Sequence, residues 1–138
     1  MFEKFDKKGF TLVELLIVVA IVAVLVAISI PILFAQLEKA REATDAANIR
    51  SAYAEVVTAA MTENPTNNVT RTVKLTQTQD GWQGSVPRIA GDGLITGTGH
   101  IGVTVVGEPD VPGNCVVTYV LPSGTSSDPS VTIEFKPI

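Results

Sequence analysis

Few side chains in this sequence have the types and spacing that chemistry needs. The 138 residues include one histidine, His100, and one cysteine, Cys115. A single histidine without a second cysteine excludes the usual transition-metal sites and most Cys/His or Ser/His nucleophile arrangements. We therefore expect no catalytic residues, no enzyme activity, no bound metal and no cofactor. The net charge of −4 and the pI near 4.9 also argue against direct nucleic-acid binding, which needs a concentrated basic face.

The side chain in the most unusual setting is the carboxylate of Glu14. It stands at the start of an uncharged run from Leu15 to Ala35, interrupted only by Ser29 and Pro31. As a helix this run is about 31 Å long, close to the hydrocarbon thickness of a bilayer. A carboxylate in such a segment is costly and normally has a partner. Because its own helix has no nearby cation, we expect that partner from a neighbouring molecule or from a positive charge newly made beside it.

The residues that flank the apolar run limit how it can be read. Residues 1–8 contain three lysines and two acids, a basic flank that predicts a cytoplasmic N-terminus. A cleaved secretory signal would have a shorter apolar core and a small-residue cleavage site. A plain single-pass membrane anchor remains the alternative, and Glu14 argues against it. The rest of the chain is then expected outside the membrane.

Residues 8–16, with the sequence KGFTLVELL, carry a more specific pattern. They resemble the class III signal of type IV pilins and of the related pseudopilins of type II secretion. The resemblance implies that residues 1–9 are a leader peptide, cleaved between Gly9 and Phe10. It also implies that the prepilin peptidase, which is also the methylase, N-methylates Phe10.

The fifth residue after the cut is a glutamate in this family, which here is Glu14. The family also has a proline about two-thirds along the apolar helix, which Pro31 matches. Cleavage would create an ammonium group at Phe10, which Glu14 could neutralise within one chain or between neighbouring subunits. Pro31 lacks an amide hydrogen, so the helix loses the bond to the carbonyl of Ala27 and tends to kink or unwind there. Ser29 is close enough to satisfy a freed backbone group; a tolerated membrane-helix proline is the plainer reading.

The helical pattern continues to about Glu63, where Asn64-Pro65 ends it. Acidic and basic residues, among them Glu38 and Asp45, are expected on the side opposite the apolar positions. These apolar positions are Leu37, Ala40, Ala43 or Ala47, Ile49, Ala52, Tyr53, Val56, Val57, Ala60 and Met61.

The remainder of the chain is rich in Thr, Val, Gly and Pro and predicts strands separated by turns. We expect an antiparallel sheet of about three or four strands packed on the amphipathic helix, an α+β type IV pilin fold. The domain organisation is then a leader (1–9), an apolar membrane or filament-core half of the helix (10–35) and a globular headgroup (36–138). The predicted strands are Val69–Gln79, His100–Val106, Cys115–Leu121 and Val131–Phe135.

The function implied by the resemblance is a structural subunit of a type IV pilus. The subunit would wait in the cytoplasmic membrane and then polymerise with copies of itself into a helical surface filament for adhesion, motility or attachment. Its partners would be the prepilin peptidase, an assembly platform and assembly ATPases. Two alternatives stay open: a pseudopilin of a type II secretion or DNA-uptake system, and a membrane-anchored enzyme or binding module.

Overall fold

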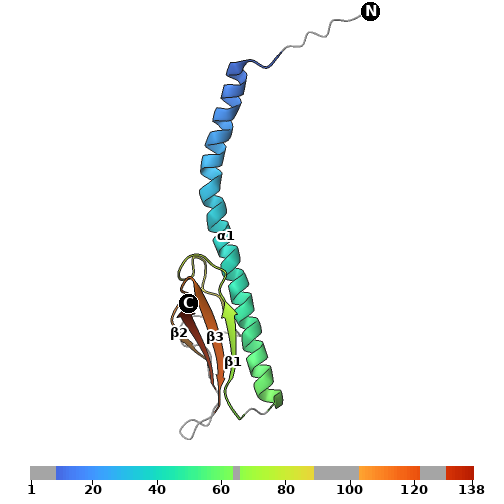
Figure 1. Cartoon of the computed structure of the whole chain (residues 1–138), viewed down its shortest axis with the longest axis vertical. Helices are drawn as coiled ribbons and strands as arrows, with labels where there is room; N and C mark the ends of the chain where they lie inside the picture. Colours follow the sequence, from blue (N-terminus) through green and yellow to red (C-terminus); the bar gives the residue numbers. More distant parts are fainter. Residues whose placement is uncertain (1–8, 64–65, 89–102, 122–129) are drawn as a thin grey trace, which may run out of the picture. The chain divides into compact units, whose positions relative to one another are not determined.

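The computed structural model describes residues 9–63, 66–88, 103–121 and 130–138. The chain divides into two units, Met1–Gln36 and Leu37–Ile138, here called the N-terminal and C-terminal units. In chain order, the described residues form one helix and four strands: α1 (Leu12–Glu63), β1 (Val69–Lys74), β2 (Val103–Val106), β3 (Gly113–Val120) and β4 (Ser130–Pro137) (Figure 1).

The N-terminal unit consists of the apolar half of α1. Every side chain from Leu12 to Gln36 is exposed, and large ones such as Ile17 (52%) and Phe34 (65%) have no packing partner in the described chain. An 18-residue window of this helix has a mean hydropathy of 3.2 and is 0% buried. By length and composition, α1 is therefore able to cross a membrane, as the sequence predicts.

In the C-terminal unit, α1 lies against the sheet and the two share one hydrophobic core (Figure 1). The helix contributes residues at spacings of three and four, which fall on one helical face. The strands contribute alternate residues, as one face of a sheet requires. The buried residues are Ala46, Ile49, Ala52 and Val56 from α1, Leu75, Cys115 and Val117, and Val131, Ile133 and Phe135 from β4. The expected α+β arrangement of one long helix and a sheet is confirmed.

Cys115 is fully buried in this core and is a free thiol. Burial disfavours the charged thiolate and raises the pKa of Cys115 to about 12. The thiol therefore stays neutral at physiological pH and serves as a small apolar side chain.

The sheet has the strand order β1-β3-β4-β2. The pairs β1–β3 and β3–β4 are antiparallel, with Val73 opposite Cys115 and Cys115 opposite Phe135. The β2–β4 pair is parallel, with Val105 opposite Ile133, so the prediction of an entirely antiparallel sheet is wrong for this pair. The reason is topological. β4 lies between β3 and β2, and these two strands run in opposite directions. Because β4 is antiparallel to β3, it is parallel to β2.

The strand bounds differ from the prediction mainly at β1, which ends at Lys74 instead of Gln79. β2 begins at Val103, and residues 100–102 of the predicted strand lie outside the described residues. The end of α1 at Glu63 is as predicted.

The buried face of α1 differs from the prediction more than the strand bounds do. Leu37 and Met61 are 43% and 80% exposed, and Ala40, Ala43 and Ala47 are exposed too. The prediction that these residues pack in the core is wrong. The charged residues Glu38, Glu42 and Asp45 are buried in their place, so the predicted solvent-facing position of Glu38 and Asp45 is also wrong. The backbone amides that follow β1 explain the exchange, as described below.

Candidate processing and assembly site

The first helical turn of α1 is closed by a capping box. Thr11 immediately precedes the first helical residue, Leu12. Its backbone N–H and its hydroxyl both donate to Glu14 Oε2, each at 2.8 Å, and the Glu14 N–H donates to Thr11 Oγ1 at 3.3 Å. These reciprocal bonds between the residue before the helix and the third helical residue satisfy amides that would otherwise lack partners.

The cap gives Glu14 a partner within its own chain. The donors of this cap are neutral, so the prediction that a positive charge from a neighbouring molecule or a newly made charge pairs with Glu14 stays a prediction. The signal was present as the spacing Thr11-x-x-Glu14, which is typical of a capping box. The same geometry holds the carboxylate at the N-terminal end of the helix, where the macrodipole favours a negative charge.

Gly9 and Phe10 lie just outside the helix, next to this cap. Both are exposed, Phe10 to 82%, and a Cβ added at Gly9 would meet no atom within 4 Å. The peptide bond between them thus belongs to uncovered, non-helical backbone. Three of the four residues singled out by the sequence, Gly9, Phe10 and Glu14, are in this way gathered at one helix end.

Pro31, the fourth, is separate, roughly 25 Å further along the helix. α1 continues through Pro31 without a break, so no turn of the helix is unwound at this residue. The Ser29 hydroxyl donates to the Leu25 carbonyl at 2.7 Å, the bond that serine commonly makes to the residue four positions earlier. Ser29 thus bonds Leu25 and not the carbonyl of Ala27.

Comparison with known proteins bears on this same segment. Residues 4–30 match the prokaryotic N-terminal methylation motif, the class III signal that marks type IV pilins and pseudopilins. The chain carries a type IV pilin or pseudopilin signal. No curated protein and no solved structure matches the chain.

The motif has consequences for the N-terminal part of the chain. It implies processing by prepilin peptidase and assembly into a polymer. The exposed apolar half of α1 fits anchoring in a membrane before that assembly. Proteins of this type are structural and are not known as enzymes.

The C-terminal unit contains a second polar arrangement, which the sequence analysis missed. Asp45 is 0% exposed, and its carboxylate accepts bonds from the Thr76 N–H at 2.8 Å, the Thr76 hydroxyl at 2.7 Å and the Gln77 N–H at 2.9 Å. These amides follow β1, and no strand of the described residues pairs with them. A buried amide without an acceptor is costly, so the carboxylate compensates for the missing strand partner.

Glu38 and Glu42 do the same for the amides that come next. Glu38 Oε1 accepts from the Thr78 N–H at 2.5 Å and the Gln79 N–H at 2.8 Å. Glu42 accepts from the amides of Gln83 at 2.5 Å and Gly84 at 3.0 Å.

We call Glu38, Glu42 and Asp45 the carboxylate row. Their spacing of four and three residues places them on the helical face that Ile49 continues. In the sequence, the available signal was that these three acids stand at the same helical spacing as the apolar residues that follow them. Within the described part of the chain, no three His, Cys, Asp or Glu side chains are grouped so as to hold a metal ion.

Electrostatics at Glu38 reflects these bonds. Burial by itself raises the pKa of this carboxyl, but the donors from Thr78 and Gln79, together with Arg41 at 3.2 Å, outweigh it. The pKa of Glu38 is therefore lowered from its ordinary value of 4.5, because each donor favours the charged form.

Proposed function

We propose that this chain is the precursor of a structural subunit of a type IV pilus. The proposal rests on one combination: the methylation motif at residues 4–30 begins a helix whose apolar half has no packing partner among the described residues. A leader (1–9), an apolar segment (10–35) and a headgroup (36–138) then have separate roles. The leader stays in the cytoplasm, the apolar segment crosses the membrane, and the headgroup is outside.

Processing converts the end of the helix into a paired charge site. Hydrolysis of the Gly9–Phe10 peptide bond leaves an α-amine on Phe10, and N-methylation keeps its positive charge. This amine belongs to the residue before Thr11, whose N–H already binds the Glu14 carboxylate. In an apolar filament core, either charge alone would be heavily penalised, whereas the two together neutralise each other. The pair favours the axial offset between subunits at which the charges meet.

Assembly then replaces lipid by sister helices around the apolar segment. Each subunit contacts the next through different surfaces, a heterologous arrangement that does not close and so gives a fibre. The prepilin peptidase, the assembly platform and its ATPases are the partners of this pathway, and the final location is the cell surface.

The first experiment is intact-mass and N-terminal analysis of the protein sheared from its own cells. We expect fibres whose subunit begins at methylated Phe10. An intact Met1 terminus confined to the membrane fraction would contradict the proposal and favour an anchored module. A third outcome is correct processing in wild-type cells that carry no fibres, together with a defect in secretion or DNA uptake in cells that lack the protein. This outcome would show that the subunit is a pseudopilin.

The role of Glu14 is tested by two substitutions that separate its cap from its charge. Glu14→Gln keeps an oxygen able to accept from Thr11, as capping boxes with glutamine do, but removes the charge. Glu14→Ala removes both. We expect both variants to be cleaved and neither to assemble at the wild-type level. Normal assembly of Glu14→Gln with failure of Glu14→Ala would mean that Glu14 acts through the cap alone.

A further inference from the structure

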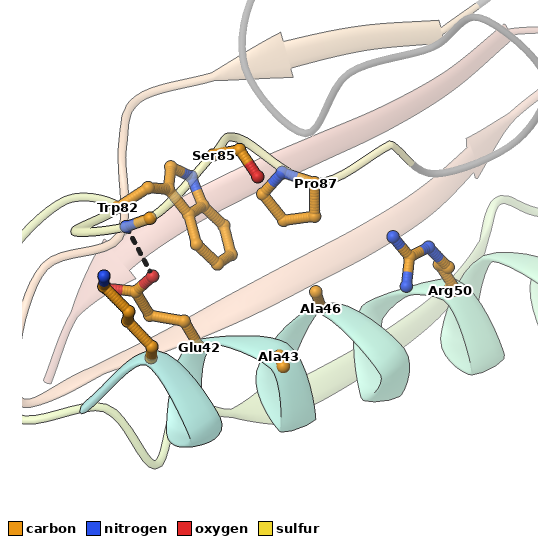
Figure 2. Close-up of a pocket in the computed structure, with 9 residues that line it drawn as sticks. Glu42, Ala43, Ala46, Arg50, Trp82, Ser85 and Pro87 are labelled. Atoms are coloured by element: carbon orange, nitrogen blue, oxygen red, sulfur yellow. Dashed lines mark hydrogen bonds between the residues drawn. The ribbon is translucent and has the colours of Figure 1, made fainter. Parts of the chain in front are cut away.

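A pocket with a volume of ≈ 520 Å³ lies in the C-terminal unit between α1 and the segment that follows residue 81. Figure 2 shows Ala43 and Ala46 on the helix below it, with Trp82, Ser85 and Pro87 on the opposite side. This volume is within the range of small-molecule sites. All these residues belong to the described chain.

The walls of the pocket are held in place by the rest of the fold. The Trp82 ring packs edge-on against Phe135, with ring centroids 6.3 Å apart and an angle of 80° between the planes. Glu42 binds the amides of Gln83 and Gly84, so the backbone beside the ring is tied to the helix. The dashed line in Figure 2 is the bond to Gly84. A half-buried aromatic face above two alanines therefore forms a preorganised slot, and preorganisation lowers the cost of binding.

Positive charge marks the two ends of this slot. Lys39 and Arg50 both line it, and eleven residues of helix place them about 16 Å apart along the axis. Neither has an acidic partner among the described residues, and Arg50 Nε donates to the carbonyl of Arg88. Glu42 also lines the pocket, and its carboxylate is already bound to two amides. Two cations that lack an acidic partner in the described part of the chain thus flank an aromatic slot, and the net charge of the whole chain is −4.

We propose that this pocket binds a short acidic oligosaccharide. A sugar ring presents an apolar C–H face that stacks on the Trp82 ring, while the small side chains of Ala43 and Ala46 leave room beneath it. Carboxylates at separate sugar units then reach Lys39 at one end and Arg50 at the other. The site lies within the C-terminal unit, so this binding does not depend on polymerisation.

Two other classes of ligand fit the pocket less well. An extended peptide is usually recognised through backbone hydrogen bonds, but the Gln83 and Gly84 amides are already used by Glu42. A nucleic acid needs a basic groove that follows many phosphates, and this pocket offers two cations in an acidic protein. An acidic sugar chain needs only the aromatic face and the few separated charges that are present.

Trp82 is the single tryptophan of the chain, so its fluorescence reports on this pocket directly. The experiment uses the full-length protein in lipid nanodiscs, titrated with tetragalacturonate and, separately, with neutral maltotetraose. We expect a saturable change in Trp82 emission with tetragalacturonate and little response to maltotetraose. Lys39→Gln and Arg50→Gln should each weaken binding about two- to fivefold, the loss expected for one exposed ionic contact.

Lys74→Gln is the matched control, because it removes an equal charge from an exposed position on β1, outside the pocket. It should leave the affinity unchanged. Equal weakening by Lys39→Gln and Lys74→Gln would overturn the proposal, since it would indicate general charge attraction.

Three further results would also overturn the proposal. One is the absence of any saturable response, and another is equally tight binding of double-stranded DNA. The third is self-association of the chain that Lys39→Gln abolishes, which would mean that a second copy fills the pocket. A filament that fails to form would contradict the proposed function without affecting these measurements.

Discussion

From Leu12 to Ala35, the apolar side chains of α1 are all exposed, whereas those of Ile49 and Val56 in the same helix are fully buried. The second set finds its partners in the chain itself, on β3 and β4. The first set has none among the residues that the structure describes, and lipid or other molecules can supply them. One continuous helix thus combines a segment whose stability is internal with a segment whose burial depends on its surroundings.

The carboxylates of the two regions differ in a parallel way. Glu14 is exposed and, among the described residues, bonds only to the Thr11 cap of its own first turn, so it stays available for a charge that arises nearby. Asp45 is fully buried and is bound to the backbone of a segment more than thirty residues away. Exposure therefore distinguishes an acid that can change partner from one that is part of the fold.

The largest expected effect comes from shortening a side chain in the buried region. Ile49→Ala should lower the free energy of unfolding of the C-terminal unit by about 2–5 kcal/mol, because it leaves a cavity in a packed core. Ile21→Ala, the same change at a residue that is 56% exposed, should leave that free energy unchanged. Denaturant unfolding of the full-length protein in detergent, followed by Trp82 fluorescence, measures both. Equal effects would contradict the division into two regions.

A smaller effect is expected from the carboxylate row. Asp45→Ala should destabilise the C-terminal unit by about 2–3 kcal/mol, since it leaves the Thr76 and Gln77 amides without acceptors. Hydrogen exchange at these two amides should become faster. Glu55→Ala is the control: it removes an exposed acid that lies 3.3 Å from Arg71 and should cost less than about 1 kcal/mol. Unchanged exchange at Thr76 in Asp45→Ala would show that other groups hold this segment.

Much of this arrangement is predictable from the sequence, because periodicity reports burial. The spacing of Ile49, Ala52 and Val56 predicts the core face of the helix, and alternation predicts the strands. Periodicity does not identify partners, so it did not give the parallel pairing of β2 with β4.

Two polar features were missed for a related reason. Assigning polar residues to the solvent side overlooked Glu38, Glu42 and Asp45, which are buried because unpaired amides after β1 require acceptors. At Glu14, the search for an opposite charge overlooked the neutral donors of Thr11 three residues earlier. In both places the deciding groups are backbone amides, which every sequence contains and whose need for a partner emerges only in the fold.

The smallest effect expected is a pH dependence that belongs to the C-terminal unit. The folded-state pKa of Glu38 is lowered from 4.5, so the unfolded chain takes up a proton first as the pH falls. The contribution of Glu38 to stability is therefore complete above pH 4.5 and is lost as the pH falls through the lower, folded-state pKa.

The Glu38→Gln variant has no such proton to gain. It should be less stable than the wild type at pH 7 and approach the stability of the wild type in acid. Thermal unfolding between pH 7 and pH 3 measures the difference. Glu134→Gln, which removes an equal charge beside Lys136 on the exposed sheet surface, controls for net charge. Parallel curves for wild type and Glu38→Gln would mean that the bonds to Thr78 and Gln79 do not depend on the charge of Glu38, and the row would then stabilise the fold through geometry alone.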